Sequence, residues 1–272
     1  MIKGVLLSNI RDLNEAPYME RFVDRIHVPD TLSIYGPLLR RWHIYRSETS
    51  LLSESVPLDA YGAYNWTMVE LHFAENPYAA RAGLGSAGGA LEEFFPPDYN
   101  ERMGLPSGKD LKRAGSWPGC ADLRLNAMIH VPLRPTESFV GTGLTLEDGP
   151  FVRWIQLLRV PDGVAEEEFE KWYTEVHAPE VAQMPHLKRF LSYRRLPELP
   201  GAFQRLSELW FADFSSWRRD VVENPPALTP PPWAPEAGYP FLQPFREMVS
   251  TFILERPTKD LLQRLCAYLY NC

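Results

Sequence analysis

Residues 169–195 read FEKWYTEVHAPEVAQMPHLKRFLSYRR, and residues 19–46 read MERFVDRIHVPDTLSIYGPLLRRWHIYR, which is nearly the same pattern. When His27 is aligned with His177, each histidine has an aromatic residue five positions before it and a proline two positions after it. Two further matches follow in the same order: LLRRWHIYR (38–46) with HLKRFLSYR (186–194), and MVELHFAE (68–75) with LSELWFAD (206–213). Repeated matches in one order indicate that the chain is a duplication.

The duplication predicts two halves, residues 1–137 and 148–272. The first half carries a long Gly- and Pro-rich insertion at 74–119, and the second carries a Pro-rich loop at 214–245 and a predicted C-terminal helix at 258–270. Each half reads β, α, β, β, long loop, β, so a second helix within the long loop would give a βαββαβ ferredoxin-like unit. We therefore expect an α+β protein with two such units in tandem.

The boundaries of the helices and strands follow from apolar periodicity and from proline positions. Pro29 disfavours helical geometry at Val28, so the first helix is expected to end near His27. A helix is predicted in the second half at 166–176. The expected strands are 2–10, 38–46, 64–73 and 123–133 in the first half, and 151–160, 187–196, 204–211 and 247–255 in the second.

Composition narrows the classes of partner. The 272 residues are 45% hydrophobic and carry a formal charge of −7, so nucleic acid and anionic membranes are not expected partners. The first residues lack the long apolar stretch of a signal peptide, and the three cysteines have the wide spacing of free thiols in a reducing compartment. We expect a cytoplasmic protein that acts on a small molecule; whether it forms a homodimer is open.

The twice-repeated pattern, a strand, then [FM]-x-x-[WF]-[YV]-x-x-x-H-x-P in a helix, then a strand bearing L-[KR]-R-[FW]-x-x-Y-R, resembles the EthD-like group of the dimeric α+β barrel superfamily. The resemblance implies two ferredoxin-like units that pack sheet against sheet and enclose a cavity, here from one polypeptide. It also implies small-molecule chemistry without a required organic cofactor, often on polyketide or aromatic-catabolism intermediates. The reactions within this group vary, so fold alone does not settle the reaction.

Strand parity indicates where the chemistry lies. Side chains alternate between the two faces of a strand, so each strand of the first half has one apolar face and one face that mixes polar, aromatic and ionisable groups. The mixed faces carry Arg41, His43 and Tyr45 on one strand, Trp66, Met68, Glu70 and His72 on the next, and Arg124, Asn126, Met128 and His130 on the fourth. In the second half Leu191 and Trp210 replace His43 and His72, which predicts a catalytic first half and an apolar wall in the second.

Histidine suits acid/base chemistry near neutral pH, tyrosine can donate to an oxyanion, and arginine can hold a carboxylate. The predicted catalytic residues are His43, His72, His27, Tyr45 and His130. The predicted substrate-binding residues are Arg41, Arg124, Glu70, Trp66, His177, Tyr193 and Trp210. With no cofactor or metal expected, this set predicts an isomerase, lyase or hydrolase acting on an unsaturated or aromatic-derived acid, lactone or ester.

Other interpretations remain open. The mixed faces can be solvated sheet surfaces, and His27 and His177 can simply interact with the carbonyl groups at helix ends. Three strand histidines can bind a divalent metal, and the superfamily contains haem-binding branches in which a residue such as His43 would be an axial ligand. A non-catalytic protein that sequesters a hydrophobic ligand is the remaining alternative.

Overall fold

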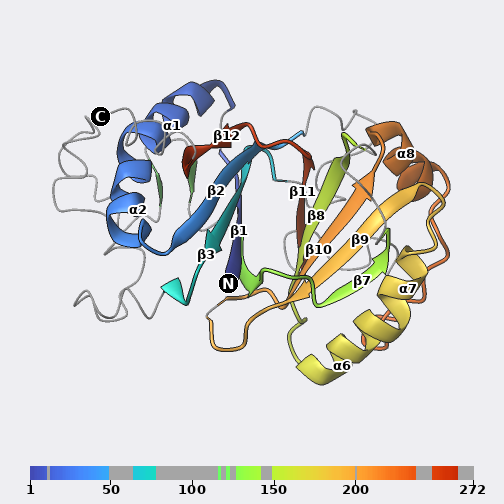
Figure 1. Cartoon of the computed structure of the whole chain (residues 1–272). Coiled ribbons are helices and arrows are strands. Elements are labelled where there is room, and N and C mark those ends of the chain that lie inside the picture. The colour runs from blue at the N-terminus through green and yellow to red at the C-terminus, as the bar shows by residue number, and fades with distance from the viewer. Residues whose placement is uncertain are drawn as a thin grey trace.

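The computed structural model describes residues 1–10, 13–48, 64–77, 116–117, 121–122, 127–141, 149–199, 201–236 and 247–262. Two five-stranded antiparallel sheets face each other across the middle of the molecule, and helices cover the outer side of each sheet (Figure 1). The arrangement is a four-layer α/β/β/α fold, which confirms the expected α+β class and the sheet-to-sheet packing.

The first half contains β1 (Ile2–Ser8), η1 (Leu13–Glu15), α1 (Ala16–Phe22), η2 (Val23–His27), α2 (Val28–Tyr35), β2 (Leu39–Arg46), β3 (Thr67–Phe73), β4 (Ser116–Trp117), β5 (Ala121–Asp122) and β6 (Ala127–Pro132). The second half, with the strand that precedes it, contains β7 (Glu137–Val140), β8 (Val152–Leu158), α6 (Glu166–Trp172), η8 (Tyr173–His177), α7 (Ala178–Val181), β9 (Leu187–Arg194), β10 (Arg205–Phe211), α8 (Phe214–Arg218), η9 (Arg219–Glu223), β11 (Met248–Leu254) and β12 (Lys259–Asp260).

The two sheets have the same internal strand order. One runs β2-β3-β1-β6 and the other runs β9-β10-β8-β11, which is the order of a ferredoxin-like unit in both cases. The second half has its second helix, α8, inside the predicted long loop, so its order is βαββαβ. In the first half most of the corresponding insertion lies outside the described residues.

Each half also contributes one short strand, a lent strand, to the sheet of the other half. β7 follows β6 in the chain but pairs with β9 of the second sheet, and β12 follows β11 but pairs with β2 of the first sheet. The backbone N–H groups of Thr136 and Thr258 donate to the carbonyl oxygens of Ser192 and Ile44 at 2.9 and 2.8 Å, so the two exchanges are equivalent. The chain therefore joins the two sheets at the β2 edge of the first sheet and at the β9 edge of the second.

Two backbone hydrogen bonds also join the two sheets directly. The backbone N–H of Glu48 donates to the carbonyl of Phe252 at 2.7 Å, and the N–H of Leu196 donates to that of His130 at 3.0 Å. Glu48 and Leu196 occupy equivalent positions just beyond β2 and β9. The two contacts repeat one arrangement and give the pair of sheets a barrel-like enclosure.

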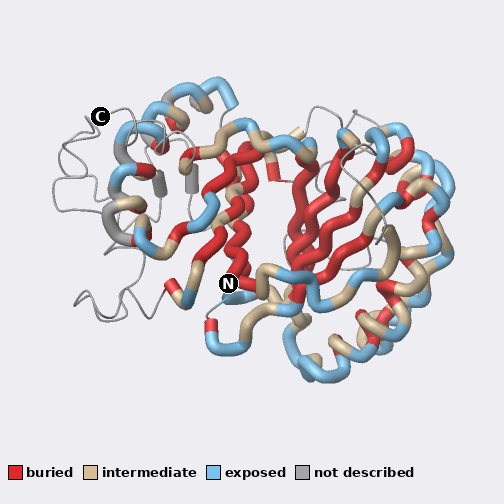
Figure 2. The backbone as a smooth tube through the Cα atoms, viewed as in Figure 1, coloured by how far each residue is buried: buried red, intermediate tan, exposed pale blue. Residues whose placement is uncertain are grey.

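Three apolar clusters follow the layers. One lies between the first sheet and its helices, a second lies between the second sheet and its helices, and a third fills the space between the sheets. The central strands β1, β8, β10 and β11 are buried on both faces, as the nearly continuous red of the middle of the molecule in Figure 2 shows. A polar side chain between the sheets is thus removed from water.

The prediction that the first helix ends near His27 is wrong. A π-helical turn, η2, ends at His27, and α2 continues to Tyr35; η8 ends at His177 in the same way. The wide turn places each proline in the first turn of the next α-helix, where its missing N–H is tolerated.

The predicted C-terminal helix at 258–270 is wrong at its start. Residues Lys259–Asp260 form the short strand β12 instead, which pairs with β2. Positions 263–270 of the predicted helix lie outside the described residues.

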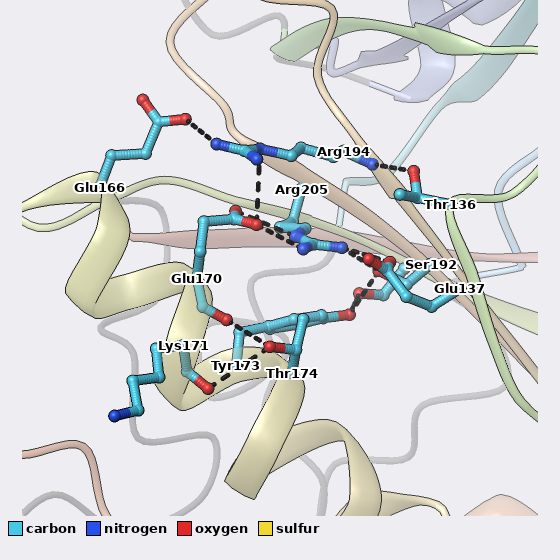
Figure 3. Close-up of polar contacts among 11 residues, drawn as sticks. Thr136, Glu137, Glu166, Glu170, Lys171, Tyr173, Thr174, Ser192, Arg194 and Arg205 are labelled. Atoms are coloured by element: carbon cyan, nitrogen blue, oxygen red, sulfur yellow. Dashed lines mark hydrogen bonds and ion pairs between the residues drawn. The ribbon is translucent and has the colours of Figure 1, made fainter.

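A buried polar network on the outer, helix-facing side of the second sheet links the edge strand β7 to the rest of that sheet (Figure 3). The guanidinium of Arg205 donates to Glu170 on α6, to Glu137 on β7, and to the hydroxyl of Ser192 at 3.2 Å. The hydroxyl of Tyr173 donates to the same Ser192 oxygen at 2.9 Å. The lent strand is therefore held by side chains as well as by its backbone.

Among the described residues, no helix is both long enough and apolar enough to cross a membrane.

Candidate functional site

The inner faces of both sheets carry a cluster of ionisable groups in an otherwise apolar layer. On β1, Lys3 alternates with residues that face the helices, and on β8 Arg153 occupies the equivalent position. Each cation lies over the tyrosine of the other half: Lys3 Nζ is 3.7 Å from the Tyr193 ring centroid, and the Arg153 guanidinium carbon is 4.8 Å from that of Tyr45. These contacts are attractive and bridge the two sheets.

Two buried glutamates balance these cations, and each has a different nearest partner. Glu208 accepts a 2.5 Å hydrogen bond from Lys3, and its other oxygen lies 3.7 Å from Arg153 Nη1. Glu70 instead lies 2.7 Å from His72 Nε2. Although burial alone would raise it, the hydrogen bond to His72 and the charges of Lys3 and Arg153 lower the pKa of Glu70 to about 2. Glu70 is thus a carboxylate at neutral pH and can orient the His72 ring.

A second polar chain lies beside this pair on β2. His43 Nδ1 is 3.4 Å from the Tyr45 hydroxyl, and His43 Nε2 is 3.2 Å from Asp260 on the lent strand β12. His43 is directly opposite Glu70 across the β2–β3 ladder, so the two groups are neighbours on one face. Burial is the main cause that raises the pKa of Tyr45, which keeps its hydroxyl protonated and able to donate.

These contacts bring together four of the predicted site residues, His43, Tyr45, Glu70 and His72, all of them buried. Arg41 is opposite His72 in the ladder but is exposed. Across the gap, Tyr193 and Trp210 lie on the inner face of the second sheet. Trp210 is half-buried, and Arg189 lies 5.0 Å from its ring centroid.

Two residues predicted to share this face are on the other one. His130 is opposite Gly4 and its ring lies 6.4 Å from that of Phe73, on the helix side of the sheet, because the register of β6 puts Ala127, Ile129 and Val131 inside. The predicted face of His130 is therefore wrong. Trp66 precedes β3 and packs in the outer cluster of the first half, so its predicted face is wrong as well.

The two helix histidines also lie in the outer layers. His27 meets Trp42 edge-on with 6.4 Å between ring centroids, and His177 stacks on Trp172 at 5.0 Å. Burial lowers the pKa of His27 to about 4 and that of His177 to about 3. Neither ring joins the cluster between the sheets. Arg124 lies outside the described residues.

Sequence reasoning missed three members of the cluster, namely Lys3, Arg153 and Asp260. A basic residue within an apolar first strand, at the same position of both copies, was a readable signal for Lys3 and Arg153. Asp260 had no such signal, because its two-residue strand was hidden in a predicted helix. Glu208 aligns with Glu70 in the repeat, where an orienting role and a structural ion pair were both open.

The arrangement bears on the haem and metal interpretations. Both ring nitrogens of His43 are engaged, by Tyr45 and Asp260, so an axial bond to iron would require one of these contacts to break. The described residues contain no group of three or more His, Cys, Asp or Glu side chains placed to hold a metal ion.

A surface pocket of about 470 Å³ lies elsewhere, on the helix side of the second half. Its two carboxylates already have partners, since Asp220 accepts from the backbone N–H of His186 at 2.8 Å and Glu180 accepts from the N–H of Thr229 at 2.7 Å. Asp220 also lies 2.5 Å from Nδ1 of His186, a residue outside the pocket lining. The cluster between the sheets is the stronger candidate site.

The family model described as chalcone isomerase N-terminal domain matches residues 1–108, which include β1, β2 and β3. None of the curated proteins compared with the sequence matches it.

Solved structures with similarity include an EthD family protein from Bacillus halodurans, as the sequence resemblance predicted, with 22% identity over 27% of this chain and 74% of that one (TM-score 0.25). An anthrone oxidase-like protein has 9% identity over 95% of this chain and 92% of that one (TM-score 0.47). A chlorite dismutase from Candidatus Nitrospira defluvii has 10% identity over 93% and 90% (TM-score 0.41). The strand order of the two sheets, rather than any single match, establishes the dimeric α+β barrel-type fold.

Proposed function

We propose that this protein is an enzyme that isomerises a small unsaturated, aromatic-derived compound by acid/base chemistry between its two sheets, with no cofactor. The observation that carries the proposal is the buried Glu70–His72 pair, 2.7 Å apart, next to the Tyr45–His43–Asp260 chain. The match of residues 1–108 to the chalcone isomerase N-terminal domain adds support, because that segment contains both histidines.

In the proposed reaction, His72 is the base. Glu70 accepts a hydrogen bond from Nε2–H, which leaves Nδ1 to take a proton from a carbon next to a carbonyl group. The electron pair of the broken C–H bond moves to the carbonyl oxygen, and the Tyr45 hydroxyl donates to the oxyanion that forms. Return of the proton to a different atom of the substrate completes an isomerisation, with no oxidant or reductant consumed.

His43 and Asp260 are assigned to positioning. Asp260 accepts from Nε2–H of His43, so Nδ1 accepts from the Tyr45 hydroxyl in the resting site, and the Tyr45 O–H turns from His43 to the oxyanion as the oxyanion forms. Because β12 comes from the far end of the chain, the site of the first half is completed by a strand that follows the second half.

The proposal is tested by absorbance against time for chelator-treated protein with a panel of chalcones, unsaturated acids, lactones and aryl esters. We expect isomerisation of at least one compound, a loss of about 100-fold or more in kcat for His72→Asn, and a smaller loss for Tyr45→Phe. His186→Asn is the matched control, since this histidine lies outside the site, and its rate should stay within about two-fold of wild type.

Other results would redirect the assignment. A rate abolished by chelation alone would favour the metal interpretation, and hydrolysis without isomerisation would favour an esterase or lactonase. A rate that survives His72→Asn would remove His72 from the mechanism. No rate with any compound, together with saturable ligand binding, would favour a binding protein.

A further inference from the structure

One buried cation between the sheets has hydrogen-bond donors for which the described residues provide no acceptor. The Arg153 side chain is 7% exposed, and within the described part of the chain neither Nε nor Nη2 has a hydrogen-bond partner. Its nearest carboxylate oxygen, on Glu208, is 3.7 Å from Nη1, too far for a hydrogen bond. Leaving charged donors unpaired in the interior is costly, so such donors indicate a missing acceptor.

The neighbouring carboxylates do not supply that acceptor. Glu208 is engaged by Lys3 at 2.5 Å, and Glu70 is engaged by His72 at 2.7 Å. Both therefore have a closer partner than Arg153. The Tyr45 hydroxyl is a further oxygen beside this guanidinium, yet Nε and Nη2 still have no acceptor among the described residues.

The unpaired donors continue along the sheet. Trp210 is opposite Arg153 on one side and opposite Arg189 on the other, so the three side chains form a row across β8, β10 and β9. Arg189 Nε and Trp210 Nε1 are likewise buried and have no acceptor among the described residues. The guanidinium carbons of Arg153 and Arg189 lie 5.2 and 5.0 Å from the Trp210 ring centroid.

The surroundings of this row are aromatic. Tyr45 lies on one side of Arg153, and the ring centroids of Phe151 and Trp210 are 5.6 Å apart. A row of N–H donors among rings matches a planar anion attached to an apolar body better than it matches a fully hydrated inorganic ion. Trp210 is half-buried, so the row reaches the edge of the enclosed layer.

We propose that Arg153, Trp210 and Arg189 form an anion-binding row that takes the carboxylate of a small aromatic or unsaturated acid. The inference deepens the proposed function, because it gives the substrate of the His72 site a carboxylate and assigns its recognition to the second half. In this arrangement the first sheet supplies acid/base groups and the second sheet supplies the groups that hold the anion.

The test is isothermal titration calorimetry of the full chain with benzoate and cinnamate, beside benzamide and cinnamamide, which have the same shape without the charge. We expect saturable binding of a carboxylate and at least about 10-fold weaker binding of its amide. Arg153→Met and Arg189→Met should each weaken carboxylate binding by about 10-fold or more, and Trp210→Phe, which removes one N–H and keeps a ring, by less.

Arg194→Met is the matched control, because this arginine is on β9 but faces the outer side, where it pairs with Glu166. It should leave the affinity unchanged. If Arg153→Met does not fold, Arg153→Lys and Arg189→Met carry the test, since Lys keeps the charge but loses the planar donors.

Three results would overturn the inference: equal binding of acid and amide, carboxylate binding that survives both arginine substitutions, or tighter binding of inorganic phosphate than of benzoate. The outcome is separable from that of the proposed function. Carboxylate binding without turnover would contradict the proposed reaction and support the anion-binding row. Turnover of neutral compounds without carboxylate binding would support the reaction and contradict the anion-binding row.

Discussion

Two buried arginines lie on opposite faces of the second sheet and have very different surroundings. Arg205 faces outward and is fully bonded: Glu170 accepts from both Nε and Nη2, and Glu137 and Ser192 accept from Nη1. Arg153 faces inward, is buried almost as deeply, and leaves two nitrogens without an acceptor among the described residues. The first arrangement is that of a structural arginine, and the second leaves donors for an acceptor that the described residues do not supply.

The same contrast runs through the layers of the molecule. The outer faces carry networks in which polar groups are used for packing and for fastening the lent strand β7. The inner faces carry acid/base groups whose charges influence one another, as the low pKa of Glu70 shows. Burial does not distinguish Arg153 from Arg205, but the completeness of their hydrogen bonding does.

The largest expected effect concerns the two arginines themselves. Arg205→Met should lower the free energy of unfolding by about 3 kcal/mol or more, because it leaves Glu170 and Glu137 without their shared cation. Arg153→Met should cost only about 1 kcal/mol, since Glu208 keeps Lys3 as its partner. Urea unfolding of both variants measures the difference; equal losses would mean that Arg153 is as much a structural residue as Arg205.

The burial of His27 and His177 in the outer layers leads to a prediction about stability at acid pH. Burial lowers the pKa of His27 to about 4 and that of His177 to about 3, so the folded protein keeps them neutral while the unfolded chain takes up protons below about pH 6.5. Stability should therefore fall as the pH drops from about 6.5 to 4, by about 1 kcal/mol per pH unit for each histidine.

Replacement of His177 by Gln removes one of these groups, so the unfolding free energy of that variant should depend less steeply on pH than that of wild type over this range. A slope that is unaffected by His177→Gln would show that this histidine does not titrate on unfolding.

The smallest expected effect on the fold, with a clear effect on rate, concerns Asp260. Its side chain is 24% exposed and contacts His43 at 3.2 Å, so Asp260→Asn should change stability by no more than about 0.5 kcal/mol. If it positions His43 and Tyr45, the substitution should lower kcat by about 10-fold and shift the pH profile of the rate. An unchanged profile would limit β12 to a structural role.

Much of this organisation could be read from the sequence. The duplication predicted two equivalent units, and the period of two along β2 and β3 correctly put His43, Tyr45, Glu70 and His72 on one face. Periodicity assigns the residues of one strand to its two faces, however, and does not show which face of the neighbouring strand lies on the same side of the sheet. His130 was misplaced for that reason, since the register of β6 against β1 depends on long-range pairing.

Other features depended on contacts between distant parts of the chain. The π-helical turns at His27 and His177 let the helices pass the prolines, which local propensity alone did not predict. Asp260 reaches His43 only because a two-residue strand crosses to the other sheet. Lys3 and Arg153 were visible as basic residues in apolar strands, but their tyrosine partners lie in the opposite half.

The central claim, that the chemistry lies between the sheets and the outer layers are structural, is tested most directly by one comparison of kcat/KM. His72→Asn and His27→Asn make the same substitution on the inner and outer sides of the first sheet, and both would be assayed on the best substrate of the panel after thermal unfolding confirms that each variant is folded. We predict a loss of about 100-fold or more for His72→Asn and a change within about three-fold for His27→Asn. An equal loss in both variants, or a larger loss for His27→Asn, would contradict the account.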